Sequence, residues 1–376
     1  MGRRVVAFGG LLGVLAGYLI AGTAASAVGP FGPPVQVLPS CPAVSNSDAA
    51  IGVDGAVRGF SSCASPSPTP PYNPYGPISF FRQSSAGGVF DQPTPYVGFV
   101  IAVSWDGTGS TYVLYSRRNV LYIGKRVEAS GRYAPPTNLS RTVSYSKVST
   151  PAALVASAGH WWAVWNENVA TAGATPRYRL FQAHTLVSQQ GRTQITAPPL
   201  GGNDQHPALG FGSGRVTLVW TRVSAHNDRS ALRIASSSGG AWSSRALTLL
   251  GTHNDYGSVT VYGGSTYVTW LRDTAGKVLF ASSAGAGGTF ASLQLGTGAR
   301  SPDFYFGLGG PTVAVSATNV FVSWTSEPYT AHVEERQAGA WSGVDPVSNH
   351  TVANRVVAQG TKARLLYDDD EVIKQT

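Results

Sequence analysis

The feature that most constrains this chain is a degenerate internal repeat of about 50 residues. Each copy contains two apolar runs rich in strand-forming residues, as in His206–Trp220 and Ser258–Trp270. A large aromatic residue, which we interpret as the end of the second strand, recurs at Trp105, Trp165, Trp220, Trp270, Trp324 and Tyr367. Its irregular spacing is typical of units with variable loops and unlike a tightly metered solenoid.

Each unit holds four short β-rich runs, here named A, B, C and D, separated by glycine or polar turns. Only 12% of the residues are charged and 45 are glycine, which suits short strands joined by turns and is poor material for long helices. Four antiparallel strands per repeat form the blade of a β-propeller, whose two apolar faces must be covered by neighbouring blades. We therefore predict an all-β fold, a single β-propeller of four-stranded antiparallel blades.

The two ends of the repeat region decide the predicted number of blades. Ala49–Phe60 fits an A–B hairpin and Ile78–Phe90 fits a C–D hairpin, which makes seven units in all. The last unit lacks a D strand, and Val35–Leu38 could supply it by pairing with Glu371–Gln375, which would close the ring. The alternative is six blades, in which Ile78–Phe90 completes the unit of Tyr367.

The N-terminus has the three parts of a secretory signal peptide. Two arginines precede an apolar run over residues 5–20, and Ala25-Ser26-Ala27 provides a small-residue cleavage site. We expect residues 1–27 to be removed, so that the protein is secreted, either extracellular or associated with the cell wall, without a membrane span. Residues 28–376 would form the propeller domain, with residues 28–77 either its first blade or partly a disordered segment rich in proline and serine.

The two cysteines, Cys41 and Cys63, are expected to form a disulfide, because an exported chain meets an oxidising environment. Neither neighbourhood offers histidine or cysteine at the spacing of metal ligands, so no metal or other cofactor is expected. The formal charge of +8 is scattered along the chain. Such a charge either serves only solubility or, in an exported protein, points to anionic glycans or polymers as partners, or to a protein, and not to nucleic acid. We expect a monomer.

Two predicted C–D turns carry a family resemblance. Ser236–Trp242 and Gln337–Trp341 resemble degraded copies of the Ser-x-Asp-x-Gly-x-x-Trp motif of sialidase-like propellers, known as the Asp-box or BNR repeat, although the aspartate is absent from both. The resemblance covers roughly residues 80–350 and implies a propeller fold. In that family the motif is structural and lies away from the active site, so we transfer no catalytic residue. The early Arg-Ile-Pro of sialidases is also missing here, and the nearest sequence is Arg82-Gln83-Ser84.

Strand direction divides the connections between two faces of the predicted propeller. The A–B and C–D turns share one face, here the short-turn face, and the B–C and D–A connections share the other, here the long-loop face. Polar side chains gather on the long-loop face, and converging polar groups at a channel mouth are typical of a ligand site. The alternative is that they are solvated turns, where asparagine and aspartate are favoured for turn geometry. We also place Asp106 on the long-loop face, as the start of a B–C loop. The candidate ligand-binding residues are Asp204, His206, Arg222, His253, Asp255, Tyr256, Arg272, Asp273, Arg300, Asp303 and His350.

No complete catalytic constellation is visible in the sequence. A glycosidase needs two carboxyls at close range, or in sialidases a tyrosine with clustered arginines, and the acids here are spread over different blades. We therefore favour a secreted, non-catalytic propeller that binds an extracellular glycan, cell-wall polymer or protein through its long-loop face. Arg222, Arg272 and Arg300 on successive blades could hold an acidic ligand. The alternative is a divergent sialidase-like glycoside hydrolase or lyase.

Overall fold

The computed structural model describes only part of the chain. The described ranges are 35–36, 44–63, 76–83, 89–118, 120–139, 152–170, 177–185, 193–195, 202–224, 229–239, 241–248, 253–272, 276–299, 310–326, 330–342, 345–348, 354–369 and 372–375. Every regular element within these ranges is a strand, which confirms the predicted all-β class. No helix in these ranges is long and apolar enough to cross a membrane.

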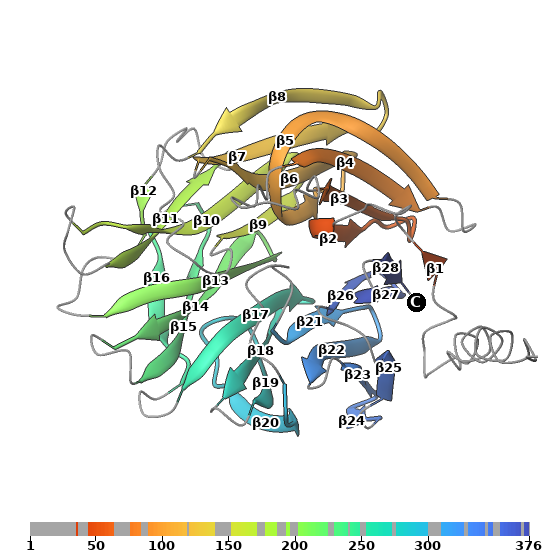
Figure 1. The fold of residues 1–376 in the computed structure, drawn as a ribbon. Coiled ribbons are helices and arrows are strands. Elements are labelled where there is room, and N and C mark those ends of the chain that lie inside the picture. The colour runs from red at the N-terminus through yellow and green to blue at the C-terminus, as the bar shows by residue number, and fades with distance from the viewer. Residues whose placement is uncertain are drawn as a thin grey trace, which may run out of the picture.

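The first half of the described chain forms a seven-stranded and a four-stranded antiparallel sheet, drawn in orange to green in Figure 1. The seven-stranded sheet contains β2 (Val44–Ile51), β3 (Val57–Cys63), β4 (Gly76–Gln83), β5 (Val89–Trp105), β6 (Ser110–Arg117), β7 (Val120–Val127) and β8 (Arg132–Asn138). The next sheet contains β9 (Ala152–Ser157), β10 (His160–Asn168), β11 (Tyr178–His184) and β12 (Thr193–Gln194).

The second half forms four more antiparallel sheets. The first contains β13 (Asn203–Gly212), β14 (Arg215–Val223), β15 (Ser230–Ser237) and β16 (Ser243–Ala246), and the second contains β17 (Asn254–Tyr262), β18 (Ser265–Arg272), β19 (Lys277–Ser283) and β20 (Ala291–Gly296). The third contains β21 (Thr312–Val315), β22 (Asn319–Ser326), β23 (Thr330–Gln337), β24 (Ala340–Trp341) and β25 (Asp345–Ser348). The fourth contains β26 (Asn354–Gln359), β27 (Lys362–Asp369), β28 (Val372–Gln375) and β1 (Val35–Gln36).

The long strand β5 belongs to two successive four-stranded units. Its first part, Val89–Gly98, pairs with β4, and its second part, Phe99–Trp105, pairs with β6. The seven-stranded sheet therefore consists of the unit β2–β5 followed by the unit β5–β8. This pairing places β4 beside β3, whereas the six-blade alternative required the Ile78–Phe90 hairpin to complete the last unit.

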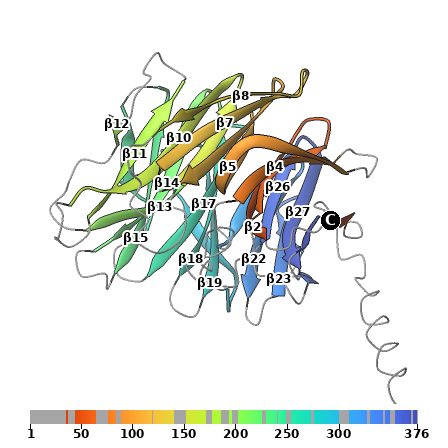
Figure 2. The same ribbon diagram turned by 45° about the horizontal axis from the view of Figure 1, so that its top comes forward.

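The predicted pairing between the two ends of the chain is confirmed for the described residues. Val35 lies opposite Gln375 and Gln36 lies opposite Lys374, so β1 is the fourth strand of the sheet that ends the chain. The first and last sheets also pack face to face, because Ile51 and Phe81 share an apolar cluster with Val357 and Leu366. Figure 2 shows these orange and blue sheets side by side.

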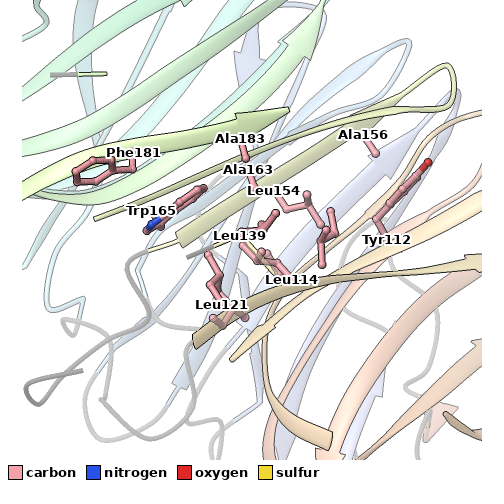
Figure 3. Close-up of a cluster of buried hydrophobic side chains, with 13 residues drawn as sticks. Tyr112, Leu114, Leu121, Leu139, Leu154, Ala156, Ala163, Trp165, Phe181 and Ala183 are labelled. Atoms are coloured by element: carbon pink, nitrogen blue, oxygen red, sulfur yellow. The ribbon is translucent and has the colours of Figure 1, made fainter. Parts of the chain in front are cut away.

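Most second and third strands of the sheets are buried on both faces. In β10 the side chains from Trp162 to Glu167 are all buried, and in β14 those from Val216 to Thr221 are. Each sheet is covered by a neighbour on either side, so these strands lack the alternation of a half-exposed sheet. Figure 3 shows one such interface, where Tyr112 and Leu114 of one unit meet Leu154 and Trp165 of the next.

One assignment of the repeat is corrected by the structure. The repeat pattern predicts that Trp105 ends a second strand, but it ends β5, which is the innermost strand of its unit. The polar residues after it form a tight A–B turn, in which the Asp106 amide donates to the carbonyl of Ser110. Asp106 therefore lies on the short-turn face and not on the long-loop face. An apolar run that ends in tryptophan before a glycine-rich turn fits either strand, which is why the sequence pattern misled.

The predicted disulfide falls partly outside the described residues. Cys41 lies in an undescribed range, whereas the backbone of Cys63 pairs with Val44 at the start of β2. The disulfide stays a prediction.

Candidate functional site

A cavity of about 600 Å³ occupies the centre of the described structure. Its wall is formed by one stretch from each unit, taken from β2, β5, β9, β13, β17, β21 and β26 or the residues directly beside them. Each of these strands packs against the next along the chain, and β26 contacts β2. The strands start on the long-loop face, so that the first residues of β13 and β17 lie at the cavity mouth on that side.

Two of the predicted ligand residues, His206 and Tyr256, occupy equivalent β-bulges at this mouth. The pairing of β13 with β14 shifts register between Gln205 and Ala208, and that of β17 with β18 shifts between Asp255 and Ser258. A bulge adds one residue to a strand and re-aims its side chain. Both residues form part of the cavity wall.

Both bulge residues have a left-handed backbone, with φ of 48° at His206 and 53° at Tyr256. Four other non-glycine residues among the described ones have positive φ, namely Arg118, Ala158, Ser213 and Ala338. Those four lie in the turns between strands, where this conformation is common. His206 and Tyr256 alone among the six lie within strands. Backbone strain of this kind persists where the surroundings enforce it and concentrates at functional sites.

Asp255 holds the two rings together. The His206 and Tyr256 rings stack with centroids 4.3 Å apart and planes 23° apart. The Asp255 Oδ1 atom accepts hydrogen bonds from His206 Nδ1 at 2.6 Å, from Thr221 Oγ1 at 2.6 Å and from the backbone amide of Tyr256 at 2.7 Å. We refer to His206, Thr221, Asp255 and Tyr256 as the mouth cluster. The sequence analysis had singled out three of its four members.

The pKa shifts in the mouth cluster favour ligand binding over acid–base chemistry at the Asp255 carboxyl and the Tyr256 phenol. Burial raises the pKa of Asp255, but the charge of His206 and the hydrogen bonds from His206, Thr221 and Tyr256 outweigh it and lower that pKa overall. Asp255 is therefore a carboxylate at neutral pH, already saturated on one oxygen. Burial first, and the nearby Asp255 charge second, raise the pKa of the Tyr256 phenol. A phenol with a raised pKa is a poor nucleophile.

Asp204 in β13 and Arg222 in β14 lie together in the unit that also carries His206 and Thr221. Asp204 is 0% exposed, and its Oδ1 accepts from Trp220 Nε1 at 3.0 Å and lies 3.2 Å from Arg222 Nη1. These contacts make Asp204 a packing residue of its unit. Arg179, which the sequence analysis missed, donates from Nη1 to the carbonyl of Gly202 at 2.8 Å. Burial first, with the charge of Arg222 among the further causes, lowers the pKa of Arg179, although the Asp204 charge acts the other way.

A further cation at the mouth was also missed. Arg355, near the start of β26, lines the cavity and forms an ion pair through Nη1 with Oδ1 of the buried Asp48 in β2. Asp48 Oδ2 accepts from the Val103 amide at 2.6 Å. Burial raises the pKa of Asp48, although Arg355 lowers it. The two partners come from opposite ends of the chain, so no local sequence pattern links them.

The remaining predicted residues are dispersed or lie outside the described ranges. His253 is exposed just before β17, and Arg272 is exposed at the end of β18. The structure leaves undescribed Asp273, Arg300, Asp303 and His350. The predicted arginine series over three units is thus described only at Arg222 and Arg272. Among the described residues no group of three or more histidine, cysteine, aspartate or glutamate side chains could hold a metal ion.

The tryptophans take structural places. Trp165, Trp220, Trp270 and Trp324 are all buried. Trp242, at the end of the first Asp-box-like turn, donates from Nε1 to Gln182 of the preceding unit at 3.0 Å and packs edge-on against Trp162. Trp341 of the second such turn packs edge-on against Phe280. These turns therefore join neighbouring units, as a structural motif would.

No family model matches the sequence, and no curated protein matches it either. Among solved structures, a protein of unknown function from Dyadobacter fermentans is 9% identical, with 82% of this chain and 98% of that chain covered and a TM-score of 0.53. Trypanosoma rangeli sialidase in complex with sialic acid is 12% identical, with 92% of this chain covered and a TM-score of 0.48. A mutant of AofleA from Arthrobotrys oligospora is 11% identical, with 84% and 90% covered and a TM-score of 0.49.

This chain spans 57% of the length of that trypanosomal sialidase. The Dyadobacter protein, which it covers almost completely, shares its overall fold. Likeness at such low identity concerns the fold alone, so the site residues have to be judged on their own geometry.

Proposed function

We propose that this chain is a secreted, closed, seven-bladed propeller that binds an acidic extracellular glycan at the long-loop mouth of its central cavity, without catalysis. The seven blades would be the unit β2–β5, the unit β5–β8 and the five sheets that follow. The pairing of β1 with β28 and the contact of β26 with β2 support closure of the ring.

The observation that carries the proposal is the stacked His206–Tyr256 pair. Two rings from neighbouring units are held at a cavity mouth in strained backbone conformations by one carboxylate. Both residues belong to the cavity wall, and Tyr256 also packs against the apolar cluster between its own unit and the next. An aromatic face with a polar edge is suited to a sugar ring, which has apolar C–H faces and hydroxyl edges.

The charges around this mouth support an acidic ligand. Arg222 pairs with Asp204 and Arg355 pairs with Asp48, in units on different sides of the cavity. A guanidinium group is a planar fork of N–H donors, which suits bidentate binding of a carboxylate or sulfate of the ligand. The exposed Arg272 adds a third positive charge on the same face.

One observation favours the enzymatic alternative. His206 Nδ1 bonds to the Asp255 carboxylate at 2.6 Å, and a carboxylate partner of this kind orients an imidazole that acts as a general base. A lyase or hydrolase would use that imidazole on a bound glycan. The raised pKa of Tyr256 weighs against the tyrosine chemistry of sialidases, and so do the three hydrogen bonds that Asp255 Oδ1 already accepts.

A glycan array probed with residues 28–376 tests the proposal. We expect acidic glycans to bind, with affinity that falls as sodium chloride is raised, because exposed ion pairs are screened by salt. Tyr256→Ala should weaken binding about tenfold or more, the loss of one aromatic contact with a sugar. Tyr262→Ala is the matched control, because Tyr262 ends the same strand at the other end of the cavity and is 38% exposed.

The proposed site would be contradicted if both tyrosine variants lost glycan affinity equally, or if neither lost any. The bound glycans should then be incubated with the protein and analysed by mass spectrometry. Cleavage that disappears in His206→Ala would establish the enzymatic alternative, whereas intact glycans agree with a binding protein.

A further inference from the structure

A second cluster of charges lies on the opposite, short-turn face. Arg58 in β3, Arg82 in β4 and Arg126 in β7, here the arginine cluster, belong to the first two units. Arg58 follows the turn between β2 and β3, Arg82 lies near the end of β4, and Arg126 precedes the turn between β7 and β8. All three stand at the short-turn ends of their strands, away from the mouth cluster.

Two carboxylates lie between the three guanidinium groups. Arg58 Nη2 is 2.6 Å and Arg82 Nη2 is 3.1 Å from the same atom, Asp54 Oδ2. Arg126 Nη1 is 2.9 Å from Glu128 Oε2, and Arg58 Nε is 3.7 Å from that oxygen. The hydrogen bond from Arg58 holds the pKa of Asp54 well below its usual value, even though burial raises it, so that this carboxylate stays charged. The cluster has three positive charges against two negative ones.

The cluster also has more donors than acceptors. The Nε atoms of all three arginines are buried without a hydrogen-bond partner among the described residues, and so is the indole Nε1 of Trp105. The Trp105 ring lies under the Arg58 guanidinium at 5.2 Å and lines the cavity at its short-turn end. Buried donors without acceptors are costly and rare in folded proteins. An added acceptor would relieve that cost.

Neighbouring charges do not cancel the excess. The Lys362 side chain lies against Gly55, next to Asp54, and adds a fourth cation. Asp106, which follows Trp105 in the chain, adds a third carboxylate, and its Oδ1 accepts the amides of Thr108, Gly109 and Ser110 in its own turn. Four cations against three carboxylates still leave one positive charge.

The cluster is buried on one side and open on the other. The Arg58 and Arg126 side chains are 6% and 8% exposed, whereas those of Arg82 and Asp54 are 43% and 41% exposed. A small anion can therefore contact the exposed Arg82 side of the cluster, beside guanidinium groups that are shielded from water. Shielding strengthens such an interaction, because the effective dielectric constant is lower than in bulk water.

We propose that the short-turn face carries a second ligand site, in which the arginine cluster binds a tetrahedral oxyanion, phosphate or sulfate. Three guanidinium groups joined through two carboxylates carry more N–H donors than those carboxylates can accept, and an anion with several acceptor oxygens suits them better than a further carboxylate would. The site would take the anion either as the inorganic ion or as an ester group on a larger molecule. It is separate from the glycan site proposed above, because it lies at the other end of the cavity.

Calorimetric titration of residues 28–376 with sodium phosphate, against sodium chloride at equal ionic strength, tests this site. We expect saturable binding of phosphate. Arg82→Gln should weaken it about tenfold, the loss of one charge-assisted contact. Arg215→Gln is the matched control, because Arg215 is an exposed arginine that begins β14, directly after the A–B turn on the same face. Phosphate binding that is the same in both variants, or absent from the unchanged protein, would overturn the proposal.

Asp54→Asn separates a ligand site from a purely structural ion-pair network. The substitution removes one of the two carboxylates and leaves an acceptor position between Arg58 and Arg82. If the cluster is an anion site, phosphate should raise the melting temperature of this variant more than that of the unchanged protein. If phosphate raises both equally, the network is structural and the proposal is wrong.

Titration with glycerol 3-phosphate distinguishes the two sources of the anion. Tighter binding than inorganic phosphate assigns an ester-borne group, and equal or weaker binding assigns the inorganic ion. Arg82→Gln should leave glycan binding at the mouth cluster unchanged, so that failure of one site is distinguishable from failure of the other.

Discussion

At the scale of single residues, the hydrogen bonds of the buried indoles explain why tryptophan recurs in successive units of this chain. Trp220 donates to Asp204 and Trp270 donates to Asn254, at matching places in successive units. Trp165 instead donates to Glu167 of its own strand at 2.6 Å. A buried indole N–H needs an acceptor, so the tryptophan and the polar residue at the start of the A strand act as one packing element.

Asp204→Ala should lower the free energy of unfolding by about 2–4 kcal/mol, because it leaves the Trp220 N–H and the Arg222 guanidinium without their buried acceptor. Asp204→Asn keeps an acceptor for Trp220, as Asn254 does for Trp270, and should cost less. Urea unfolding of both variants measures the difference. Equal losses would show that the indole contact contributes little.

Glu334 gives a pH dependence that can be tested. It is buried in β23, and burial raises its pKa to about 7 from the usual 4.5. Because the folded protein holds this proton more tightly than the unfolded chain, Glu334 favours folding below about pH 4.5, and that contribution is lost as the pH rises to about 7. On the same strand His332, whose pKa burial lowers, adds no charge to offset Glu334 at neutral pH.

Glu334→Gln removes the loss of folding stability that the ionisation of Glu334 causes as the pH rises. The melting temperature of the variant relative to the unchanged protein should rise by a few degrees between pH 5 and pH 8. Scanning calorimetry of both proteins at the two pH values measures this rise. A constant difference would mean that the Glu334 carboxyl ionises in the folded protein as it does in water.

At the scale of elements, the sequence predicted the hairpins better than their places in the repeat. The hairpins over Ala49–Phe60 and Ile78–Phe90 are present because alternating apolar residues around glycine-rich turns determine them locally. Trp105 was misplaced because β6, the true second strand of that unit, has no tryptophan. The continuous strand β5, shared by two units, also leaves no turn by which the sequence could mark their boundary.

The pairing of β1 with β28 predicts how the ends stabilise each other. A chain that begins at residue 40 lacks β1 and leaves β28 as an unpaired edge. Amides of β28 should exchange with deuterium faster in that chain than in residues 28–376. Hydrogen exchange followed by mass spectrometry measures this, and unchanged exchange would show that β1 does not hold the last sheet.

The Cys41–Cys63 disulfide is predicted to close a loop of about 20 residues, worth roughly 3 kcal/mol in the chain-entropy model. Protein exported into an oxidising compartment should therefore resist alkylation unless it is first reduced. Its unfolding midpoint should also fall on reduction. Two alkylated cysteines in the unreduced exported protein would refute the bond.

At the scale of the whole molecule, the site depends on contacts between units that no single repeat encodes. His206 and Asp255 come from adjacent units, and Arg355 meets Asp48 only because the last sheet lies against the first. The sequence indicated polar residues at the A-strand starts, which was enough to select His206, Asp255 and Tyr256. It could not show that Asp204 is buried against Trp220, that Arg179 bonds to Gly202 or that Arg355 lines the cavity. Such contacts depend on side-chain direction, which is decided by bulges and by neighbouring units.

The most direct test of the central claim is a crystal structure of residues 28–376 with the acidic glycan that binds best on the array. The account predicts a ring of seven blades, with a sugar in contact with the stacked His206 and Tyr256 rings and its acidic group within hydrogen-bond distance of an arginine on the long-loop face. A glycan bound elsewhere, with the mouth cluster open to water, would contradict the account.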